Sequence, residues 1–427
     1  MRHSRPAPLA ALLLAAALAA CSDAPDRVAP TAPARSSAHA HAEGGGAKGV
    51  FHRYVAIGTS VSEGWRSDGV LAASQETSWP AQLARLANRE LSLPRIAFPG
   101  CGAPLVTPLA SGLRLSGEPA AAPFLSRVCA GNEAGVTLPA GNVAISGART
   151  IHALTATPEQ PDPNNAPLYA RTLAPGQSQV TAMEAQNPKV VSVELGANEV
   201  LGARDGAYVP GQTVVPVSFW APDYRQVVAR VAATAKHAVL VGLLDDAAAF
   251  PSFRRGAELW DARATFAPLH VTVAPDCEGS QNLMFVAVRV PVAAAQGAAR
   301  RNAGQSPAVL SCANAPATGP DGQVIRDYVL SPAELALLNA QLTQMNAVVR
   351  AEAARYGFAY FALGALYEQA NVKAPFNAVT LMTAPEPYGP LVSADGVHPS
   401  AAGARVLALA AANALNARYR FRIPVGL

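Results

Sequence analysis

The sequence predicts an α/β fold in which a mainly parallel sheet carries helices on both of its faces. From His52 onward, short continuous apolar runs alternate with longer amphipathic stretches. Continuous apolar strands are typical of parallel sheets, because helices cover such strands on both sides. The regular alternation of the two kinds of segment therefore favours a sheet built from strand–helix–strand units.

The order of the expected strands and helices follows from where the apolar residues form continuous runs and where they recur at helical spacing. Tyr54 to Ile57 is the first expected strand, and further strands are expected at 95–98, 142–145, 190–195, 238–243 and 358–361. Apolar residues at helical spacing predict helices at 79–91, 223–236, 331–356 and 400–419. The helix at 331–356 has a clear start signal, with Ser331 as the N-cap, Pro332 in the first turn and Glu334 three residues after the cap.

Two long segments interrupt this alternation, at about 101–141 and about 245–330. Both are predicted to be irregular insertions, and such segments in a compact domain are usually functional loops or lids. The second insertion is rich in aromatic residues, which predicts either the lining of an acyl or sugar pocket or a small core of its own. These residues are Phe250, Phe253, Trp260, Phe266 and Phe285.

Besides Cys21, the chain has four cysteines, and an even number in an exported protein predicts disulfides. Four cysteines allow three pairings. The pairs that are neighbours in the sequence, Cys101–Cys129 and Cys277–Cys312, are expected, because each brackets a segment rich in Pro, Gly and Ala. Neither a Cys-x-x-Cys motif nor a nearby histidine supports a zinc site, so we expect no metal.

The N-terminal region predicts export and attachment to a membrane. Residues 1–21 have a basic start and an apolar run too short to span a bilayer, as in a signal peptide. The run ends in Leu-Ala-Ala-Cys, which resembles a bacterial lipobox and implies that Cys21 carries a lipid anchor. By the same resemblance, Ser22 after the cysteine favours the outer membrane. Residues 22–48 are rich in Ala, Pro, Ser and Gly and predict a flexible tether, so the folded domain is expected at 49–427.

The charge of the chain excludes a nucleic-acid partner. The formal net charge is +4, and basic residues form only isolated pairs such as Arg254-Arg255. Nucleic-acid-binding domains instead carry a basic patch or stripe. After the signal peptide, no segment is apolar and long enough for a transmembrane helix, so the lipid on Cys21 is the expected membrane attachment.

Three short motifs carry the groups that acyl transfer through a serine ester requires. Gly58-Thr59-Ser60 offers a hydroxyl, Gly196-Ala197-Asn198 offers an amide donor, and the segment from Asp395 to His398 offers a base beside a carboxylate. A serine hydroxyl becomes a good nucleophile when a base accepts its proton and a third group orients that base. Each motif follows a strand or precedes a helix, so we expect the three to meet at one edge of the sheet. The last segment could instead only cap a helix start, but this would leave the other two motifs unexplained.

In this order, the motifs resemble the sequence blocks of the SGNH, or GDSL-type, hydrolases. The Gly-Asp-Ser-Leu block matches 56–61, the glycine block 142–148, the Gly-x-Asn-Asp block 196–199 and the Asp-x-x-His block 395–398. The resemblance implies a flavodoxin-like α/β/α sandwich, the SGNH hydrolase fold. It also implies a serine esterase or lipase that uses no cofactor.

By the same resemblance, Ser60 is the nucleophile, His398 the base and Asp395 the carboxylate that orients the base. The oxyanion hole would consist of the backbone N–H groups of Ser60 and Gly147 and the side-chain amide of Asn198. Gly100 is an alternative to Gly147, because it also follows an expected strand.

Two positions depart from the family pattern. Thr59 stands where the family has Asp before the nucleophile, and Glu199 stands where it has Asp after the amide residue. Neither position belongs to the triad or to the oxyanion hole. We therefore expect the replacements to change how the loops are held rather than the chemistry.

These features predict a membrane-tethered serine hydrolase that cleaves a lipid acyl ester or an O-acetyl group of a polysaccharide through an acyl-enzyme. Two alternatives remain open on the same fold. One is an acyltransferase, which would use the same residues and pass the acyl group to a sugar or lipid hydroxyl. The other is a surface lipoprotein that binds a partner without catalysis.

Overall fold

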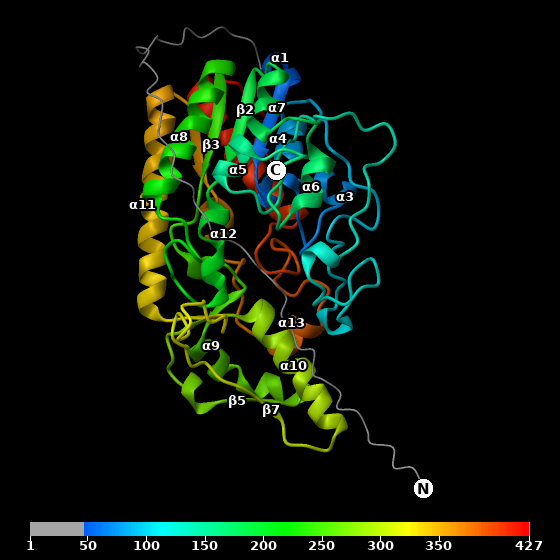
Figure 1. The fold of residues 1–427 in the computed structure, drawn as a ribbon, viewed down its shortest axis with the longest axis vertical. Coiled ribbons are helices and arrows are strands. Elements are labelled where there is room, and N and C mark those ends of the chain that lie inside the picture. Colours follow the sequence, from blue (N-terminus) through cyan, green and yellow to red (C-terminus); the bar gives the residue numbers. More distant parts are fainter. Residues whose placement is uncertain (1–46, 427) are drawn as a thin grey trace.

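A parallel sheet lies at the centre of the computed structural model, which describes residues 47–426. Its strand order is β1-β2-β3-β9, and Figure 1 shows its two middle strands, β2 and β3, side by side. The strands are β1 (Tyr54–Gly58), β2 (Val190–Glu194), β3 (His237–Gly242) and β9 (Ala359–Ala362). All of them were expected from the sequence, so the α/β class and the parallel sheet are confirmed.

The expected strand at 142–145 runs alongside β1 as a short extended segment. Val143 donates its backbone N–H to the carbonyl of Ala56 at 2.9 Å, and Ile145 donates to the carbonyl of Gly58 at 3.1 Å. Counted second in chain order, this segment gives the sheet the order 2-1-3-4-5 of flavodoxin-like folds. The order reverses at β1, and sheets of this kind bind ligands beyond the carboxyl ends of their strands at that point.

Two layers of helices cover the sheet, and each layer encloses an apolar core. One face carries α5 (Thr150–Thr155), α7 (Gln179–Ala185), α8 (Val217–Thr234) and α11 (Pro332–Tyr356), and the other carries α4 (Trp79–Leu86) and α14 (Ala401–Tyr419). Successive strand residues alternate between the cores, with Val55 and Ile57 in the first and Tyr54 and Ala56 in the second. Such alternation follows from the pleat of a strand that is covered on both sides.

Some helix boundaries differ from the expected ones. α4 ends at Leu86 instead of 91, and α8 begins at Val217 instead of 223, with Pro222 inside the helix. α11 agrees with the expectation, and its N-cap Ser331 accepts a hydrogen bond from the backbone of Glu334 at 3.3 Å. The other helices are α1 (Ala47–Val50), α2 (Ser60–Glu63), α3 (Ala72–Glu76), α6 (Ala166–Thr172), α9 (Gly256–Asp261), α10 (Val286–Asn302), α12 (Gly364–Tyr367) and α13 (Ala378–Thr383).

The strand expected at 95–98 is wrong. These residues do not join the central sheet, and Ala97 instead donates its backbone N–H to Gly131 in the first insertion at 2.8 Å. Pro94 and Pro99 flank the segment. Because proline has no N–H to donate to a ladder, the two prolines limit the segment to this short pairing.

The first insertion is irregular, as expected. Between 101 and 141 the only helical turns are two 3-10 segments, η2 (Leu109–Ser111) and η3 (Phe124–Ser126). A disulfide joins Cys101 to Cys129. The segment is therefore held by a covalent bond and by side-chain contacts instead of by regular secondary structure.

The expectation of an irregular second insertion is wrong, because residues 245–330 contain regular structure. An antiparallel sheet of order β4-β6-β8, a parallel pair β5-β7, and the helices α9 and α10 form there. Figure 1 shows α9, α10, β5 and β7 together at one end of the molecule, away from β2 and β3. The strands are β4 (Phe253–Arg255), β5 (Val271–Val273), β6 (Leu283–Phe285), β7 (Ala308–Leu310) and β8 (Val329–Leu330).

The aromatic residues of this second insertion pack into the two apolar cores that flank the central sheet. Phe253, Phe266 and Phe285 are buried, and the Cys277–Cys312 disulfide is buried with them. Strands of two or three residues are too short for an apolar alternation to be visible in the sequence. Phe253 and Phe285 join the core on the α11 side and Phe266 joins the core on the α14 side, so these three rings serve packing instead of lining a pocket.

Both disulfides have the expected pairing, and they indicate an oxidising, extracytoplasmic compartment. Within residues 47–426, no helix has the length and apolar character needed to cross a membrane. The predicted signal peptide at 1–21, its Cys21 and the tether up to residue 46 lie outside the described residues. α1 covers the last two residues of the predicted tether.

Because the sheet is buried on both faces, truncating a side chain in its core should lower the free energy of unfolding. Leu240 lies in the middle of β3 with none of its surface exposed, whereas Leu337 on α11 is 53% exposed. Leu240→Ala is expected to lower the free energy of unfolding by about 2–5 kcal/mol, because it leaves a cavity in a closely packed core. Leu337→Ala, the matched control, should change it by less than about 0.5 kcal/mol. Urea unfolding of both variants measures this, and equal losses would contradict the assigned core.

Candidate active site

Ser60 stands in a tight turn between the end of β1 and the start of α2. Gly58 closes β1, and a Cβ atom at this position would lie 2.6 Å from Oγ of Ser62, so only glycine fits there. Ser60 is the first residue of α2, and its side chain is almost fully buried. The turn therefore presents the hydroxyl at the carboxyl edge of the sheet, beside the point where the strand order reverses.

His398 and Asp395 reach Ser60 from the opposite end of the chain. Oγ of Ser60 lies 2.8 Å from Nε2 of His398, and Nδ1 of His398 lies 2.9 Å from Oδ2 of Asp395. The other carboxylate oxygen, Oδ1, accepts the backbone N–H groups of Val397 and His398, each at 2.9 Å. One short turn before α14 therefore carries both groups and fixes their mutual orientation.

The protonation states in this chain of hydrogen bonds follow from the surroundings of Asp395. Its burial by itself would raise the pKa, but the charge of His398 and hydrogen bonds from His398 and Val397 hold the pKa of Asp395 well below its usual range. The carboxylate is thus ionised and can only accept hydrogen bonds. Nδ1 of His398 must then carry the proton, which leaves Nε2 free to accept the proton of the Ser60 hydroxyl.

The glycine block lies on the loop after 142–145, and Asn165 holds it in place. The side-chain amide of Asn165 donates to the carbonyl of Ser146. Gly147 has φ +77°, and a Cβ atom there would lie 2.7 Å from Nδ2 of Asn165. Because a trans peptide directs its C=O and N–H to opposite sides, fixing the Ser146 carbonyl also fixes the direction of the Gly147 N–H.

Glu63 holds the same loop from the other side. Its Oε2 accepts the backbone N–H of Ser146 at 2.8 Å, while Oε1 is buried with no hydrogen-bond partner among the described residues. Burial raises the pKa of Glu63 to about 7, although hydrogen bonds from Ser146 and the charge of His398 act in the opposite direction. Glu63 therefore connects the nucleophile turn to the glycine block.

Asn198 follows β2 in the 3-10 turn η4 (Ala197–Glu199). Its side-chain amide donates to the carbonyl of Ala148 at 2.9 Å, which places it against the loop that contains Gly147. Among residues 47–426, the backbone N–H groups of Ser60 and Gly147 have no protein acceptor. The N–H of Gly100, in contrast, donates to the carbonyl of Ala97 at 2.9 Å.

The two residues that depart from the family pattern both serve loop attachment. Thr59 donates its hydroxyl to the buried carboxylate of Glu194 at 2.8 Å and its backbone N–H at 3.0 Å. Burial raises the pKa of Glu194, and the hydrogen bonds from Thr59 and Ser62 oppose this rise. Glu199 accepts the backbone N–H of Thr150, the first residue of α5, at 2.6 Å. These contacts agree with the expectation that the replacements alter how the loops are held.

The roles of four residues were not predicted from the sequence: Glu63, Asn165, Glu194 and Asp68, whose backbone N–H donates to Oδ2 of Asp395 at 2.9 Å. Glu63 had a weak signal, because it lies three residues after Ser60 and thus on the same side of a helical turn. The other three are brought to the site by long-range contacts, and their neighbours in the sequence carry no pattern that indicates this.

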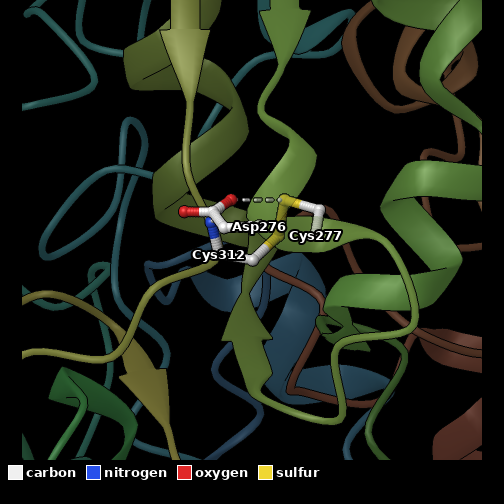
Figure 2. Close-up of side chains that lie close together, drawn as sticks. All are labelled: Asp276, Cys277 and Cys312. Atoms are coloured by element: carbon white, nitrogen blue, oxygen red, sulfur yellow. Dashed lines mark hydrogen bonds between the residues drawn. A yellow bond between two sulfur atoms is a disulfide. The ribbon is translucent and has the colours of Figure 1, made fainter.

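The grouping of Asp276, Cys277 and Cys312 is structural (Figure 2). Both sulfur atoms are joined in the disulfide, so neither can bind a metal as a thiolate. Oδ1 of Asp276 instead accepts the backbone N–H of Cys312 at 3.0 Å. The carboxylate therefore braces the disulfide within the second insertion.

No family model matches the chain, and no curated protein does. Among solved structures, it is similar to a protein from Parabacteroides merdae described as a GDSL-like lipase, with 13% identity over 86% of this chain and 95% of that chain and a TM-score of 0.32. It is also similar to a carbohydrate esterase family 2 enzyme with a carbohydrate-binding domain from Corynascus thermopiles (Myceliophthora fergusii), with 14% identity over 77% and 69% of the two chains and a TM-score of 0.24. Both similarities are in overall structure, at low sequence identity.

The burial of Glu63 predicts that the stability of the folded protein depends on pH. The folded-state pKa of about 7 lies above the ordinary value of 4.5, so between these values the folded protein keeps a proton that the unfolded chain releases. Wild-type stability should therefore fall as the pH rises through this window and then level off. Glu63→Gln lacks this titration, so it should gain stability relative to wild type across the window, by about 3 kcal/mol at most.

Urea unfolding of wild type and Glu63→Gln at a series of pH values measures this difference. Other carboxylates titrate in both proteins and cancel in the comparison. A difference that stays constant over the whole pH range would show that folding does not change the pKa of Glu63.

Proposed function

We propose that the protein is an exported serine esterase that forms an acyl-enzyme at Ser60. The observation that carries this proposal is the continuous chain of hydrogen bonds from Ser60 through His398 to the ionised Asp395. A serine in such a chain is activated, because His398 can accept its proton while Asp395 stabilises the imidazolium that forms. A serine that only capped a helix would not need a buried histidine and carboxylate behind it.

The reaction follows from these roles. Oγ of Ser60 attacks the ester carbonyl carbon while its proton passes to Nε2 of His398. His398 then gives this proton to the leaving alcohol oxygen, and the C–O bond of the ester breaks to leave an acyl group on Ser60. Water attacks the acyl carbon while Nε2 of His398 accepts its proton, the bond from this carbon to Oγ of Ser60 breaks, and His398 returns the proton to Oγ as the carboxylic acid leaves.

The negative charge that develops on the carbonyl oxygen needs hydrogen-bond donors. We assign this role to the backbone N–H groups of Ser60 and Gly147 and to the amide of Asn198. The first two have no protein acceptor among the described residues, whereas the N–H of Gly100 is already used. Donors of this kind act only on charge that appears during the reaction, so they accelerate it instead of only binding the substrate.

The cellular setting of the proposal combines the disulfides with the N-terminal sequence. The disulfides support an extracytoplasmic location. The Leu-Ala-Ala-Cys motif supports a lipid anchor on Cys21, and Ser22 directly after it favours the outer membrane. The substrate would accordingly be a carboxylic ester at or outside that membrane, either a lipid acyl ester or an acylated polysaccharide.

Covalent labelling tests the activated serine directly. A fluorophosphonate probe should label the wild-type protein at Ser60, whereas Ser60→Ala and His398→Ala should lose the label. Ser111→Ala, which changes an exposed serine of the first insertion, should keep it. A folded wild-type protein that does not react would contradict the proposal and favour a binding role for the same fold.

The role of Asn198 has its own test. Asn198→Ala is expected to lower kcat by about a hundred- to a thousandfold and to change KM little, because the lost hydrogen bond forms with the transition-state oxyanion. Steady-state hydrolysis of p-nitrophenyl acetate measures both constants. Full turnover of this variant would remove Asn198 from the oxyanion hole.

A further inference from the structure

Asp395 has a hydrogen-bond partner that belongs to neither its own turn nor Ser60. The backbone N–H of Asp68 donates to Oδ2 of Asp395 at 2.9 Å. This is the same oxygen that faces Nδ1 of His398. The direction of the Asp68 N–H therefore bears on the orientation of the carboxylate, and through it on that of the imidazole.

The backbone at Asp68 adopts a conformation that needs support. Its φ is +59°, in the left-handed region, and the preceding Ser67 has φ +49°. Residues with a Cβ atom occupy this region rarely, although Asp and Asn tolerate it better than most. Ser67 is bound to the Asp395 loop as well, because its N–H donates to Oγ of Ser393 at 3.0 Å. The turn at Ser67 and Asp68 thus has a left-handed backbone and is hydrogen-bonded to the loop that carries Asp395.

Two arginines from the first insertion hold the side chain of Asp68. Arg114 lies 2.5 Å and Arg127 lies 2.8 Å from its Oδ2. Arg114 also donates to the backbone carbonyl of Asp68 at 3.0 Å. The side chains of the two arginines are only 1% and 9% exposed, whereas that of Asp68 is 39% exposed, so solvent screens these ion pairs from the Asp68 side only.

The local pattern around Arg114 is the reverse of the usual one. Arg114 is 2% exposed, while its neighbours Leu113 and Leu115 are 45% and 39% exposed. In extended backbone, neighbouring side chains point to opposite sides, so Leu113 and Arg114 cannot both face the interior. The segment turns its charged residue inward and two leucines outward, although arginine is almost never buried without partners. The contacts to Asp68 and to nearby carbonyls account for this choice.

We propose that Asp68 is a positioning residue for Asp395, and that the first insertion acts on the active site through Arg114, Arg127 and Asp68. This inference rests on the proposed function. The insertion is then a working part of the active site, although none of its residues needs to touch the ester. Cys101 strengthens the connection, because it exchanges two backbone hydrogen bonds with Val70, two residues after Asp68.

The expected effect of losing this support is on turnover and not on substrate binding. A carboxylate that is held less firmly lets the imidazole of His398 turn away from Ser60. Misplacement of a reacting group by about 1 Å can lower a rate about a hundredfold. Substrate binding does not depend on that angle, so KM should stay the same.

The test uses two substitutions, one rescue and one matched control. Asp68→Asn keeps the size and tolerates the left-handed backbone but removes the charge, and Arg127→Gln removes one of its two partners. Arg127→Lys restores a cation and should recover part of the activity. Arg95→Met is the control, because Arg95 pairs with Glu133 of the same insertion and with Glu76 but contacts no residue of the triad.

Hydrolysis of p-nitrophenyl acetate should show kcat of Asp68→Asn lowered at least about tenfold, and kcat of Arg127→Gln lowered less, with KM within about twofold of wild type. The double variant should lose no more than Asp68→Asn alone, because both changes act through one contact. Arg95→Met should match wild type. Equal losses in Arg95→Met and Asp68→Asn would overturn the proposal, because they would indicate general loosening of the insertion.

Proton NMR of the resting protein provides a second readout that needs no substrate. The proton on Nδ1 of His398, shared with Asp395, gives a resonance far downfield. It should shift or broaden in Asp68→Asn and stay unchanged in Arg95→Met. An unchanged resonance and unchanged kcat in well-folded Asp68→Asn would refute the positioning role. If wild type hydrolyses no ester, the proposed function fails, and the resonance alone decides whether Asp68 positions the pair.

Discussion

The loops at the carboxyl edge of the sheet depend on buried carboxylates that accept backbone N–H groups. Glu194 holds the turn of Ser60, Glu63 holds the glycine block, Glu199 holds the start of α5, and Asp395 holds its own turn. Each carboxylate loses hydration on burial, so backbone donors have to replace water. In Asp395 the charge of His398 and the hydrogen bonds from His398 and Val397 together outweigh this loss and lower the pKa, whereas burial raises the pKa of the three glutamates. The candidate active site thus contains one carboxylate that is firmly ionised and three that serve mainly as anchors.

The parallel sheet explains why residues so distant in the sequence can form one site. The Ser60 turn, the glycine block and the Asn198 turn each follow a strand or extended segment, and these lie next to each other in the sheet. Their carboxyl ends point the same way, so three separate loops emerge at a single edge. The Asp395–His398 turn closes the group from the start of α14. Sheet order, and not sequence proximity, therefore decides which side chains meet.

Much of this arrangement could be predicted from the sequence, because the central strands are long enough to give a visible apolar pattern. The strands around Val55 and Leu240 have four or more apolar residues in a row, and the motif from Asp395 to His398 is compact enough to be recognised. The second insertion was mispredicted because its strands have only two or three residues. Arg114 and Asn165 were missed for a different reason. Between two leucines Arg114 looks like a solvated side chain, and nothing near Asn165 indicates that it will grip the Ser146 carbonyl.

The Cys101–Cys129 disulfide closes a ring that contains both Arg114 and Arg127, and the two cysteines have a sequence separation of 28. In the loop-closure model, cross-linking a loop of this size removes chain entropy from the unfolded state that is worth about 3.6 kcal/mol at 25 °C. Part of the entropy needed to bring two guanidinium groups to one carboxylate is therefore lost already when the sulfurs join. Formation of this disulfide outside the cytoplasm thus does more than stabilise the fold. It also favours the arrangement in which Arg114 and Arg127 contact Asp68, next to Asp395. In a chain whose cysteines are still reduced, folding itself has to overcome the whole entropy cost of bringing Arg114 and Arg127 to Asp68.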